Sequence, residues 1–210
     1  MEQYNFLLVD DEVLLREGVR SLLAREDFVS EILEASNLLE FDKCLRENRV
    51  DIVLLDFRLK GANGLELMEH LKTLELAPKV IVLTGLEGTE LLVNLLKAGV
   101  NGVVFKLDGY SAILQSIRGV MQGGYFFSEK MMKLIQQNVN RWESIPPVTL
   151  NVQDKVMLRS IAEGLTTKEI AVQMKMTEGT TETYRVRLLK KVGVANTAAL
   201  LAYAYRNGLL

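Results

Sequence analysis

Side chains suited to metal binding and phosphoryl transfer stand at the ends of four short apolar runs. They are three aspartates, a threonine and a lysine: Asp10, Asp11, Asp56, Thr84 and Lys106. Carboxylates bind divalent cations, and a carboxylate can accept a phosphoryl group as an acyl phosphate. A hydroxyl and an ammonium group can hold the oxygens of that phosphoryl group. A lone Asp-Asp pair is more often the start of a helix, so the prediction of one site depends on the shared position of all these residues.

The apolar runs predict strands of one parallel sheet. Four of them are apolar throughout, as expected for strands buried on both faces, and a fifth candidate is interrupted by polar residues. The runs are Phe6–Val9, Ile52–Leu55, Val80–Leu83, Gly102–Phe105 and the weaker Ser30–Ala35. Helical spacing marks the segments Val13–Arg25, Leu38–Glu47, Gly64–Leu74, Glu87–Ala98 and Tyr110–Met121. This alternation predicts a doubly wound α/β fold with a five-stranded parallel sheet.

The predicted sheet explains how distant residues could form one site. Reactive groups in an open parallel sheet gather at the carboxyl ends of the strands. We assign Asp56 as the phosphoryl acceptor, Asp11 as a direct metal ligand, and Asp10 as a ligand acting directly or through water. Mg²⁺ suits such a site because it takes oxygen ligands and keeps waters that a phosphate can replace. Lys106 would pair with the phosphate, and Thr84 would donate to one of its oxygens.

The chain after the predicted sheet changes character. Residues 122–128 break the pattern, and Ser128 could cap a short helix through about Val139. Pro146 and Pro147 favour an extended, semi-rigid linker. We therefore expect an α/β domain over residues 1–122, a linker with a short helix over residues 123–148, and a second domain over residues 149–210.

The last part of the chain predicts an all-α domain with a helix-turn-helix. Asn151, Thr166 or Thr167, Thr177 and Thr197 mark the starts of four helical patterns. The second and third patterns are joined by a short turn, and the third would be the recognition helix. Its hydroxyls and positive charges suit a nucleic acid backbone. A basic helix alone fits a protein-binding bundle about equally well, so that alternative stays open at this point.

Charge and composition agree with two different parts. Residues 1–140 hold 15 Lys+Arg and 21 Asp+Glu, which gives −6, whereas residues 141–210 hold 10 and 6, which gives +4. The asymmetry indicates an acidic site first and a polyanionic partner second. The single cysteine allows no disulfide within the chain. The N-terminus lacks the basic region of a signal peptide, and no run approaches the roughly 18 apolar residues of a membrane span. We expect a cytoplasmic protein without membrane contact.

Residues 1–122 resemble the receiver domain of two-component response regulators, which has a flavodoxin-like fold. The matching motifs are Leu8-Val-Asp-Asp11, Val53-Leu-Leu-Asp56, Val82-Leu-Thr84 and Phe105-Lys106. The resemblance implies that a sensor histidine kinase phosphorylates Asp56 and that Mg²⁺ is required. It also implies a further metal ligand, the backbone carbonyl of Arg58. Val103 stands where the family usually has a switch aromatic. Phe105 either partly replaces that aromatic or belongs to the core, and we favour the core.

Residues 150–210 resemble the DNA-binding domain of the NarL/FixJ (LuxR-type) family. The matching motifs include Glu163-Gly-Leu165, Lys168-Glu-Ile-Ala171, Glu178-Gly-Thr180 and Lys190–Val194. The resemblance implies that the third helix enters the major groove of double-stranded DNA and that the last helix can dimerise. It places near phosphates Thr166, Lys168, Thr177 and Thr180, and near base edges Glu182, Thr183, Val186 and Arg187. Lys190 adds positive charge to this DNA-binding set. Glu182 stands where the family often has Lys, and its carboxylate could accept from a cytosine amino group.

The two resemblances together predict a phosphorylation-controlled transcription regulator that is a homodimer when active. Self-phosphorylation from a phosphodonor and autodephosphorylation are the only turnover that we expect. One alternative is a regulator that works without phosphorylation, because the switch aromatic is missing. Another is a regulator that acts through a protein partner, because Glu182 weakens the attraction of the recognition helix for phosphates.

Overall fold

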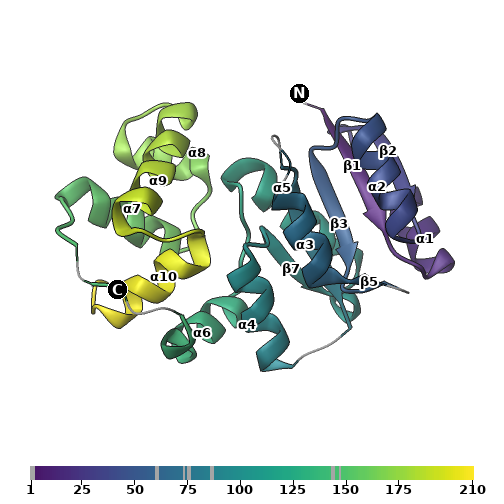
Figure 1. Cartoon of the computed structure of the whole chain (residues 1–210). Helices are drawn as coiled ribbons and strands as arrows, with labels where there is room; N and C mark the ends of the chain where they lie inside the picture. The colour runs from purple at the N-terminus through teal and green to yellow at the C-terminus, as the bar shows by residue number, and fades with distance from the viewer. Residues whose placement is uncertain are drawn as a thin grey trace. The chain divides into compact units, whose positions relative to one another are not determined.

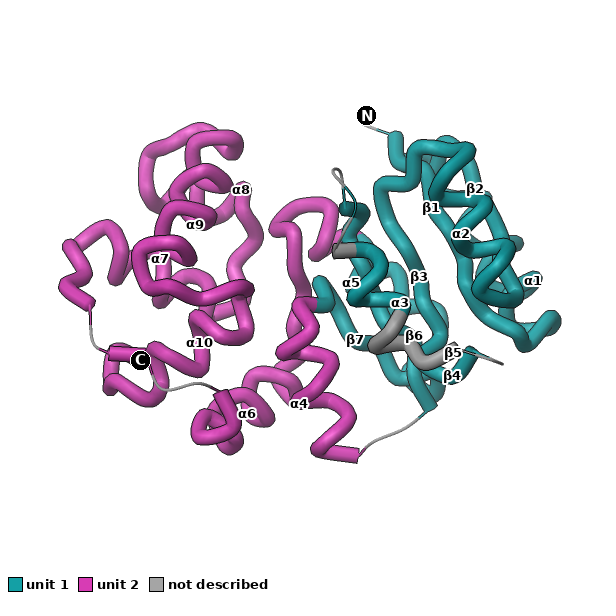
Figure 2. Tube along the Cα trace, in the orientation of Figure 1, with its two compact units in different colours: residues 1–87, 100–117 teal, residues 88–99, 118–210 magenta. Residues whose placement is uncertain are grey.

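The computed structural model describes residues 3–59, 62–72, 74, 77–85, 88–142, 145–146 and 148–210, and Figure 1 shows its elements. Contacts within the chain divide it into two compact units (Figure 2). The first comprises Met1–Glu87 and Val100–Ile117, and the second comprises Gly88–Gly99 and Arg118–Leu210. The domain boundaries predicted at residues 122 and 148 are a different division, continuous along the chain, and they stay a prediction.

The first unit contains a sheet of five parallel strands in the order β2-β1-β3-β6-β7. The strands are β1 (Tyr4–Val9), β2 (Val29–Ala35), β3 (Ile52–Asp56), β6 (Lys79–Thr84) and β7 (Gly102–Phe105). Every residue of β3 and β7 is buried, as their apolar sequences require. The strand order reverses between β1 and β3, so a ligand site is expected at the carboxyl ends of these strands. The predicted five-stranded parallel sheet is confirmed.

Helices connect the strands of this sheet in the chain. They are α1 (Val13–Leu23), α2 (Leu38–Glu47) and α3 (Gly64–Lys72), and α5 (Gly109–Gly123) follows the last strand. Helix α1 contacts β1 and β2, and α2 contacts β2 (Figure 1). Val19, Leu23 and Phe41 point their apolar side chains into the core, where they are buried. This one-sided burial follows from the helical spacing of apolar residues.

Two short features of the first unit are not predicted by the sequence. An antiparallel pair, β4 (Arg58–Leu59) with β5 (Ala62–Asn63), follows β3. Two residues are too few to show the alternation of a strand. A 3-10 turn, η1 (Lys106–Asp108), follows β7 directly.

Helices make up the second unit. They are α4 (Thr89–Ala98), α6 (Glu129–Gln137), the 3-10 turn η2 (Val139–Arg141), α7 (Val152–Ala162), α8 (Thr167–Met174), α9 (Glu178–Val192) and α10 (Thr197–Arg206). Helix α10 contacts α4, α6, α7, α9 and η2, and its Leu200 and Leu201 are fully buried. The predicted all-α C-terminal domain is confirmed.

Four helices of the second unit, α6 to α9, begin at caps that the sequence predicts, and α10 begins at the predicted Thr197 with Asn196 as its cap. The side chain of Ser128 accepts from the backbone of α6, and Asn151 begins α7 with a capping box. Thr166, rather than Thr167, caps α8, and Thr177 caps α9. Each cap satisfies a backbone amide that the helix leaves unpaired and contributes about 1 kcal/mol to stability.

Of the two prolines that predict an extended linker, Pro147 lies outside the described residues. The same holds for Glu87, the first residue of a predicted helix that begins at Thr89 in the structure. Within the described part of the chain, no helix combines the length and the apolar character needed to cross a membrane.

Candidate functional site

Three carboxylates meet at the carboxyl ends of β1 and β3. Asp10 directly follows β1, Asp11 comes next, and Asp56 is the last residue of β3. One oxygen from each carboxylate lies within 4.8 Å of the others, and Asp10 and Asp56 are buried. The parallel pairing of β1 with β3 brings them together, because paired parallel strands end at the same edge of the sheet.

These carboxylates fit a divalent cation. Asp10 Oδ2 is buried, and among the described residues it has no hydrogen-bond partner, although Lys106 Nζ lies 3.1 Å away as an ion pair. Buried carboxylate oxygens usually have donors, so this atom is suited to a metal ion with oxygen ligands such as Mg²⁺. Arg58, whose backbone carbonyl is the predicted further ligand, lies in β4, and its amide donates to Asp56 Oδ1 at 3.3 Å.

Lys106 joins the acidic cluster from the end of β7. Its Nζ lies 3.1 Å from Asp10 Oδ2, 3.1 Å from Asp56 Oδ2 and 2.9 Å from Glu12 Oε1. Burial alone would lower the pKa of Lys106. The hydrogen bond to Glu12 and the negative charges of Asp10 and Asp56 outweigh burial, so the pKa is raised above its usual value. The ammonium group is therefore charged at any physiological pH.

The environment of Asp56 makes its carboxylate more basic. Burial raises the pKa of Asp56, and the neighbouring charge of Asp10 raises it further. The charge of Lys106 and the amide of Arg58 oppose this effect without cancelling it. A raised pKa at a buried carboxylate is a common property of functional sites.

Thr84 and Phe105 occupy neighbouring strand ends. Thr84 is the last residue of β6 and is buried, and it directly follows Leu83, the pairing partner of Asp56. Phe105 pairs with Thr84 from β7 and is also buried. The register thus places Thr84 beside the strand of the predicted acceptor. The burial of Phe105 agrees with the preferred interpretation of this residue as core.

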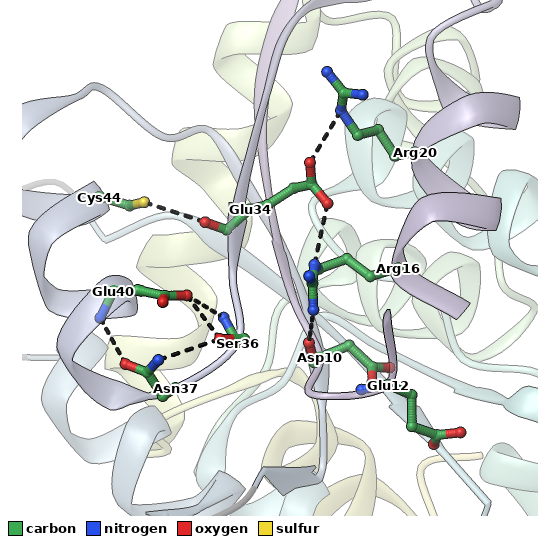
Figure 3. A network of polar contacts seen from close by, with 9 residues as sticks. All are labelled: Asp10, Glu12, Arg16, Arg20, Glu34, Ser36, Asn37, Glu40 and Cys44. Atoms are coloured by element: carbon green, nitrogen blue, oxygen red, sulfur yellow. Dashed lines mark hydrogen bonds and ion pairs between the residues drawn. The ribbon is translucent and has the colours of Figure 1, made fainter. Parts of the chain in front are cut away.

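A network of polar contacts supports the end of β1 from α1 and β2 (Figure 3). Arg16 Nη1 donates to the backbone carbonyl of Asp10 at 2.6 Å, and its Nε lies 3.1 Å from Glu34 Oε1. Arg20 Nε lies 3.1 Å from the other oxygen of Glu34. The amide of Glu12 donates to Asp10 Oδ1 at 2.8 Å. Sequence reasoning misses Arg16 and Glu12, because neither stands at the end of a strand.

The residues that the resemblance assigns to DNA binding lie on one exposed part of the second unit. Exposed side chains come from α8, α9 and the turn between them: Lys168, Thr177, Thr180, Thr183, Val186, Arg187 and Lys190. Thr166 and Glu182 are half-buried. The turn contains Lys175, whose φ of 55° ends α8 in the left-handed region. The structure therefore leaves this set available to a partner.

Tyr184 and Lys191 fix α9 to α7. Tyr184 Oη donates to Asp154 Oδ1 at 2.8 Å, and Lys191 Nζ lies 2.5 Å from Asp154 Oδ2. Burial raises the pKa of Asp154, but the bonds from Lys191, the Asn151 amide and Tyr184 outweigh burial and hold the pKa below its usual value. Asp154 thus links the start of α7 to two residues of α9 that lie about two helical turns apart.

Comparison with known protein families identifies both parts of the chain. The family model of the response regulator receiver domain matches residues 6–118, more than half of the chain. The chain belongs to the response regulators. A second family model, of bacterial regulatory proteins of the luxR family, matches residues 149–204 of this response regulator. It is a DNA-binding transcription regulator of the NarL/FixJ type, and phosphorylation control is typical of its family.

Whole-length relatives agree with this assignment. BvgA of Bordetella pertussis is 30% identical to this response regulator over 204 residues, which are 97% of each chain. The nitrate/nitrite response regulator protein NarP of Escherichia coli is 27% identical over 98% of this chain and 96% of its own. The response regulator UvrY of Escherichia coli is 29% identical over 98% of this chain and 95% of its own.

Solved structures share the fold of this response regulator. RcsB of Salmonella typhimurium superposes with a TM-score of 0.59 at 22% identity, over 97% of this chain and 98% of RcsB. A structure of an RcsB–DNA complex gives a TM-score of 0.61 at 22% identity, over 96% and 98% of the chains. At this identity the likeness concerns the fold alone.

Proposed function

We propose that Asp56 accepts a phosphoryl group from a sensor histidine kinase and that this step controls DNA binding. The convergence of Asp10, Asp11 and Asp56 beside Lys106 carries the proposal. In the transfer, a carboxylate oxygen of Asp56 forms a bond to phosphorus. The bond from phosphorus to the kinase histidine nitrogen breaks, and the imidazole leaves with the electron pair. Phosphoryl transfer depends chiefly on positioning and charge neutralisation, which this cluster is built to supply.

The cofactor in this proposal is Mg²⁺, held by Asp10, Asp11, Asp56 and the backbone carbonyl of Arg58. When bound, the ion would neutralise the charge of the phosphoryl oxygens. Lys106 would exchange a carboxylate partner for a phosphoryl oxygen, since its Nζ is already 3.1 Å from Asp56. Thr84 would donate to another oxygen. Self-phosphorylation from a phosphodonor and autodephosphorylation are the turnover that we propose.

The second part of the proposal is that α9 enters the major groove of double-stranded DNA. The hydroxyls of Thr166, Thr177 and Thr180 at the starts of α8 and α9 suit phosphate oxygens, and the +4 balance of residues 141–210 suits a polyanion. The proposed phosphate contacts are Thr166, Lys168, Thr177 and Thr180, with Lys190 adding positive charge. The proposed base-edge contacts are Glu182, Thr183, Val186 and Arg187.

We further propose that the active form is a homodimer whose two DNA-binding domains occupy two half-sites. Linking two weak modules on one DNA molecule raises the overall affinity without new contacts. The receiver domain would comprise residues 1–122, the linker residues 123–148 and the DNA-binding domain residues 149–210. Because the proposed partners are a sensor histidine kinase and DNA, we place the protein in the cytoplasm.

Labelling with acetyl phosphate, followed by intact-mass measurement, tests the acceptor assignment. With Mg²⁺ we expect one phosphoryl group on each chain, lost on treatment with hydroxylamine as an acyl phosphate should be. Chelation of Mg²⁺ and the Asp56→Asn substitution should each abolish the label. Equal labelling of Asp56→Asn would refute the acceptor assignment. A folded parent chain that takes no label would favour the phosphorylation-independent alternative.

A further inference from the structure

The carboxylate of Glu182 is held by one arginine on the same helix. Arg185 Nε lies 3.1 Å from Glu182 Oε2, and Arg185 Nη2 lies 2.5 Å from Glu182 Oε1. Both oxygens are therefore engaged by the two parallel donors of one guanidinium group. Such bidentate pairs fix the plane and the direction of a carboxylate more firmly than a single contact does. Glu182 is half-buried, and 41% of its side chain stays accessible to solvent.

Arg185 is itself fixed on its other sides. Only 9% of its side chain is exposed, and its Nη1 donates to Thr197 Oγ1 at 3.2 Å. Its Cζ lies 5.2 Å from the centre of the Tyr125 ring, within the range of a cation–π contact. The Tyr125 hydroxyl is buried without a hydrogen-bond partner among the described residues. The tyrosine therefore contributes its ring, rather than its hydroxyl, to this contact.

This arrangement changes what an acidic residue can do on a helix that approaches DNA. A free carboxylate would repel the phosphates, whereas the pair of Glu182 with Arg185 has no net charge. A carboxylate oxygen has two lone-pair sites, so Glu182 can still accept a further hydrogen bond on its accessible side. Its direction is set by the anchored guanidinium group, and it does not have to be ordered when DNA binds.

We propose that Arg185 is a positioning residue that holds Glu182 as a fixed acceptor for a base amino group in the major groove. The proposal rests on the proposed DNA binding by α9 and extends it to sequence preference. Cytosine N4 and adenine N6 are the amino groups exposed in that groove. Guanine and thymine present acceptor atoms there, which would face the carboxylate unpaired. Glu182 would therefore select cytosine or adenine at one position of each half-site.

Selection of bound sequences from random DNA provides the first test. The sequences selected by the parent chain should share a cytosine or an adenine at one position, and this preference should depend on Glu182. Glu182→Ala and Arg185→Lys should each weaken the preference at that position by about tenfold, because a good base contact discriminates by that order. The matched control Lys190→Gln should weaken binding to all sequences alike. Preferences are ratios of affinities, so partial unfolding of a variant does not change them.

Base analogues provide the second test, on the selected site. At the Glu182-dependent position, 2-pyrimidinone would replace cytosine, or purine would replace adenine, which removes the amino group. The parent chain should lose about tenfold in affinity, whereas Glu182→Ala, which has no acceptor at this position, should lose much less. Tyr125→Phe should keep the preference of the parent, and Tyr125→Leu, which removes the ring from Arg185, should reduce it.

The outcomes separate this inference from the proposed function. If the parent chain binds no DNA at low salt, the proposed function fails. If the parent chain binds and Glu182→Ala tightens binding to all sequences without changing any preference, Glu182 reads no base and the inference is overturned. If Glu182→Ala changes the preference and Arg185→Lys does not, the positioning role of Arg185 is refuted.

Discussion

The ammonium group of Lys106 contacts three carboxylates. Its Nζ lies 2.9 to 3.1 Å from an oxygen of Asp10, Asp56 and Glu12. The proposed reaction requires Lys106 to turn to the phosphoryl group. Of its three carboxylate partners, Glu12 is the exposed one, with 65% of its side chain accessible. Glu12 therefore competes with the phosphoryl group for Lys106, and it places an exposed negative charge beside Lys106.

Glu12→Gln should speed phosphorylation by acetyl phosphate about two- to fivefold. The substitution removes a charge that repels an anionic donor. Two unit charges about 4 Å apart interact by about 1 kcal/mol in water. The rate is measured by intact mass at low ionic strength. Glu31→Gln serves as the control, because Glu31 is an exposed carboxylate nearer the amino end of β2 and should leave the rate unchanged. A slower Glu12→Gln would show that Glu12 orients Lys106 productively.

Residue identity predicts part of this site and misses the rest. Asp10, Asp11, Asp56, Thr84 and Lys106 are recognisable because strand ends in a parallel sheet share one edge. Contacts of flexible side chains between elements have no periodic signal. Glu12 and Arg16 therefore emerge only from the structure: Arg16 supports the Asp10 carbonyl from α1, and Glu12 reaches across to Lys106.

At the scale of elements, the attachment of α9 to α7 depends on the charge of Asp154. The folded pKa of Asp154 lies below its usual value because Lys191, the Asn151 amide and Tyr184 bind the charged form and outweigh the effect of burial. A depressed folded pKa adds stability above the unfolded pKa of about 3.9. That stability is lost as the pH falls through the folded pKa.

Asp154→Asn should lower the free energy of unfolding by about 1–3 kcal/mol at pH 7, because buried bonds to a charged group are lost. The difference from the parent chain should shrink as the pH falls below about 4. Urea unfolding followed by circular dichroism at several pH values measures this difference. Glu163→Gln, at an exposed carboxylate directly after the same helix, should cost little at every pH. A difference for Asp154→Asn that does not change with pH would refute the ionic contribution.

The elements themselves follow closely from sequence where they are long and periodic. The buried run of β3 and the capped start of α7 are both predicted, since burial on both faces and a capping box leave clear patterns. The pair of β4 and β5 is not predicted, because a two-residue strand has no period. Helix α5 extends to Gly123, two residues into the segment 122–128 that is expected to end it, because a pattern change only approximates a helix end.

At the scale of the whole molecule, an acidic receiver and a basic DNA-binding domain share one chain. The balance of −6 over residues 1–140 and +4 over residues 141–210 agrees with the proposed phosphoryl transfer in the first part and the proposed binding of a polyanion in the second. Phosphorylation can control DNA binding only if the phosphorylated and unphosphorylated forms differ in their affinity for DNA. The sequence indicates the receiver and the DNA-binding domain. The coupling between them depends on how the phosphorylated and unphosphorylated forms differ, which a sequence pattern does not show.

The most direct test measures the affinity for a selected DNA site before and after phosphorylation, at one fixed salt concentration. The parent chain treated with acetyl phosphate and Mg²⁺ should bind at least tenfold more tightly than the untreated chain, as expected for a coupling free energy of about 1.4 kcal/mol or more. Asp56→Asn should bind like the untreated parent under both conditions. Equal affinity of the labelled and unlabelled parent chains, with labelling verified by mass, would contradict phosphorylation control.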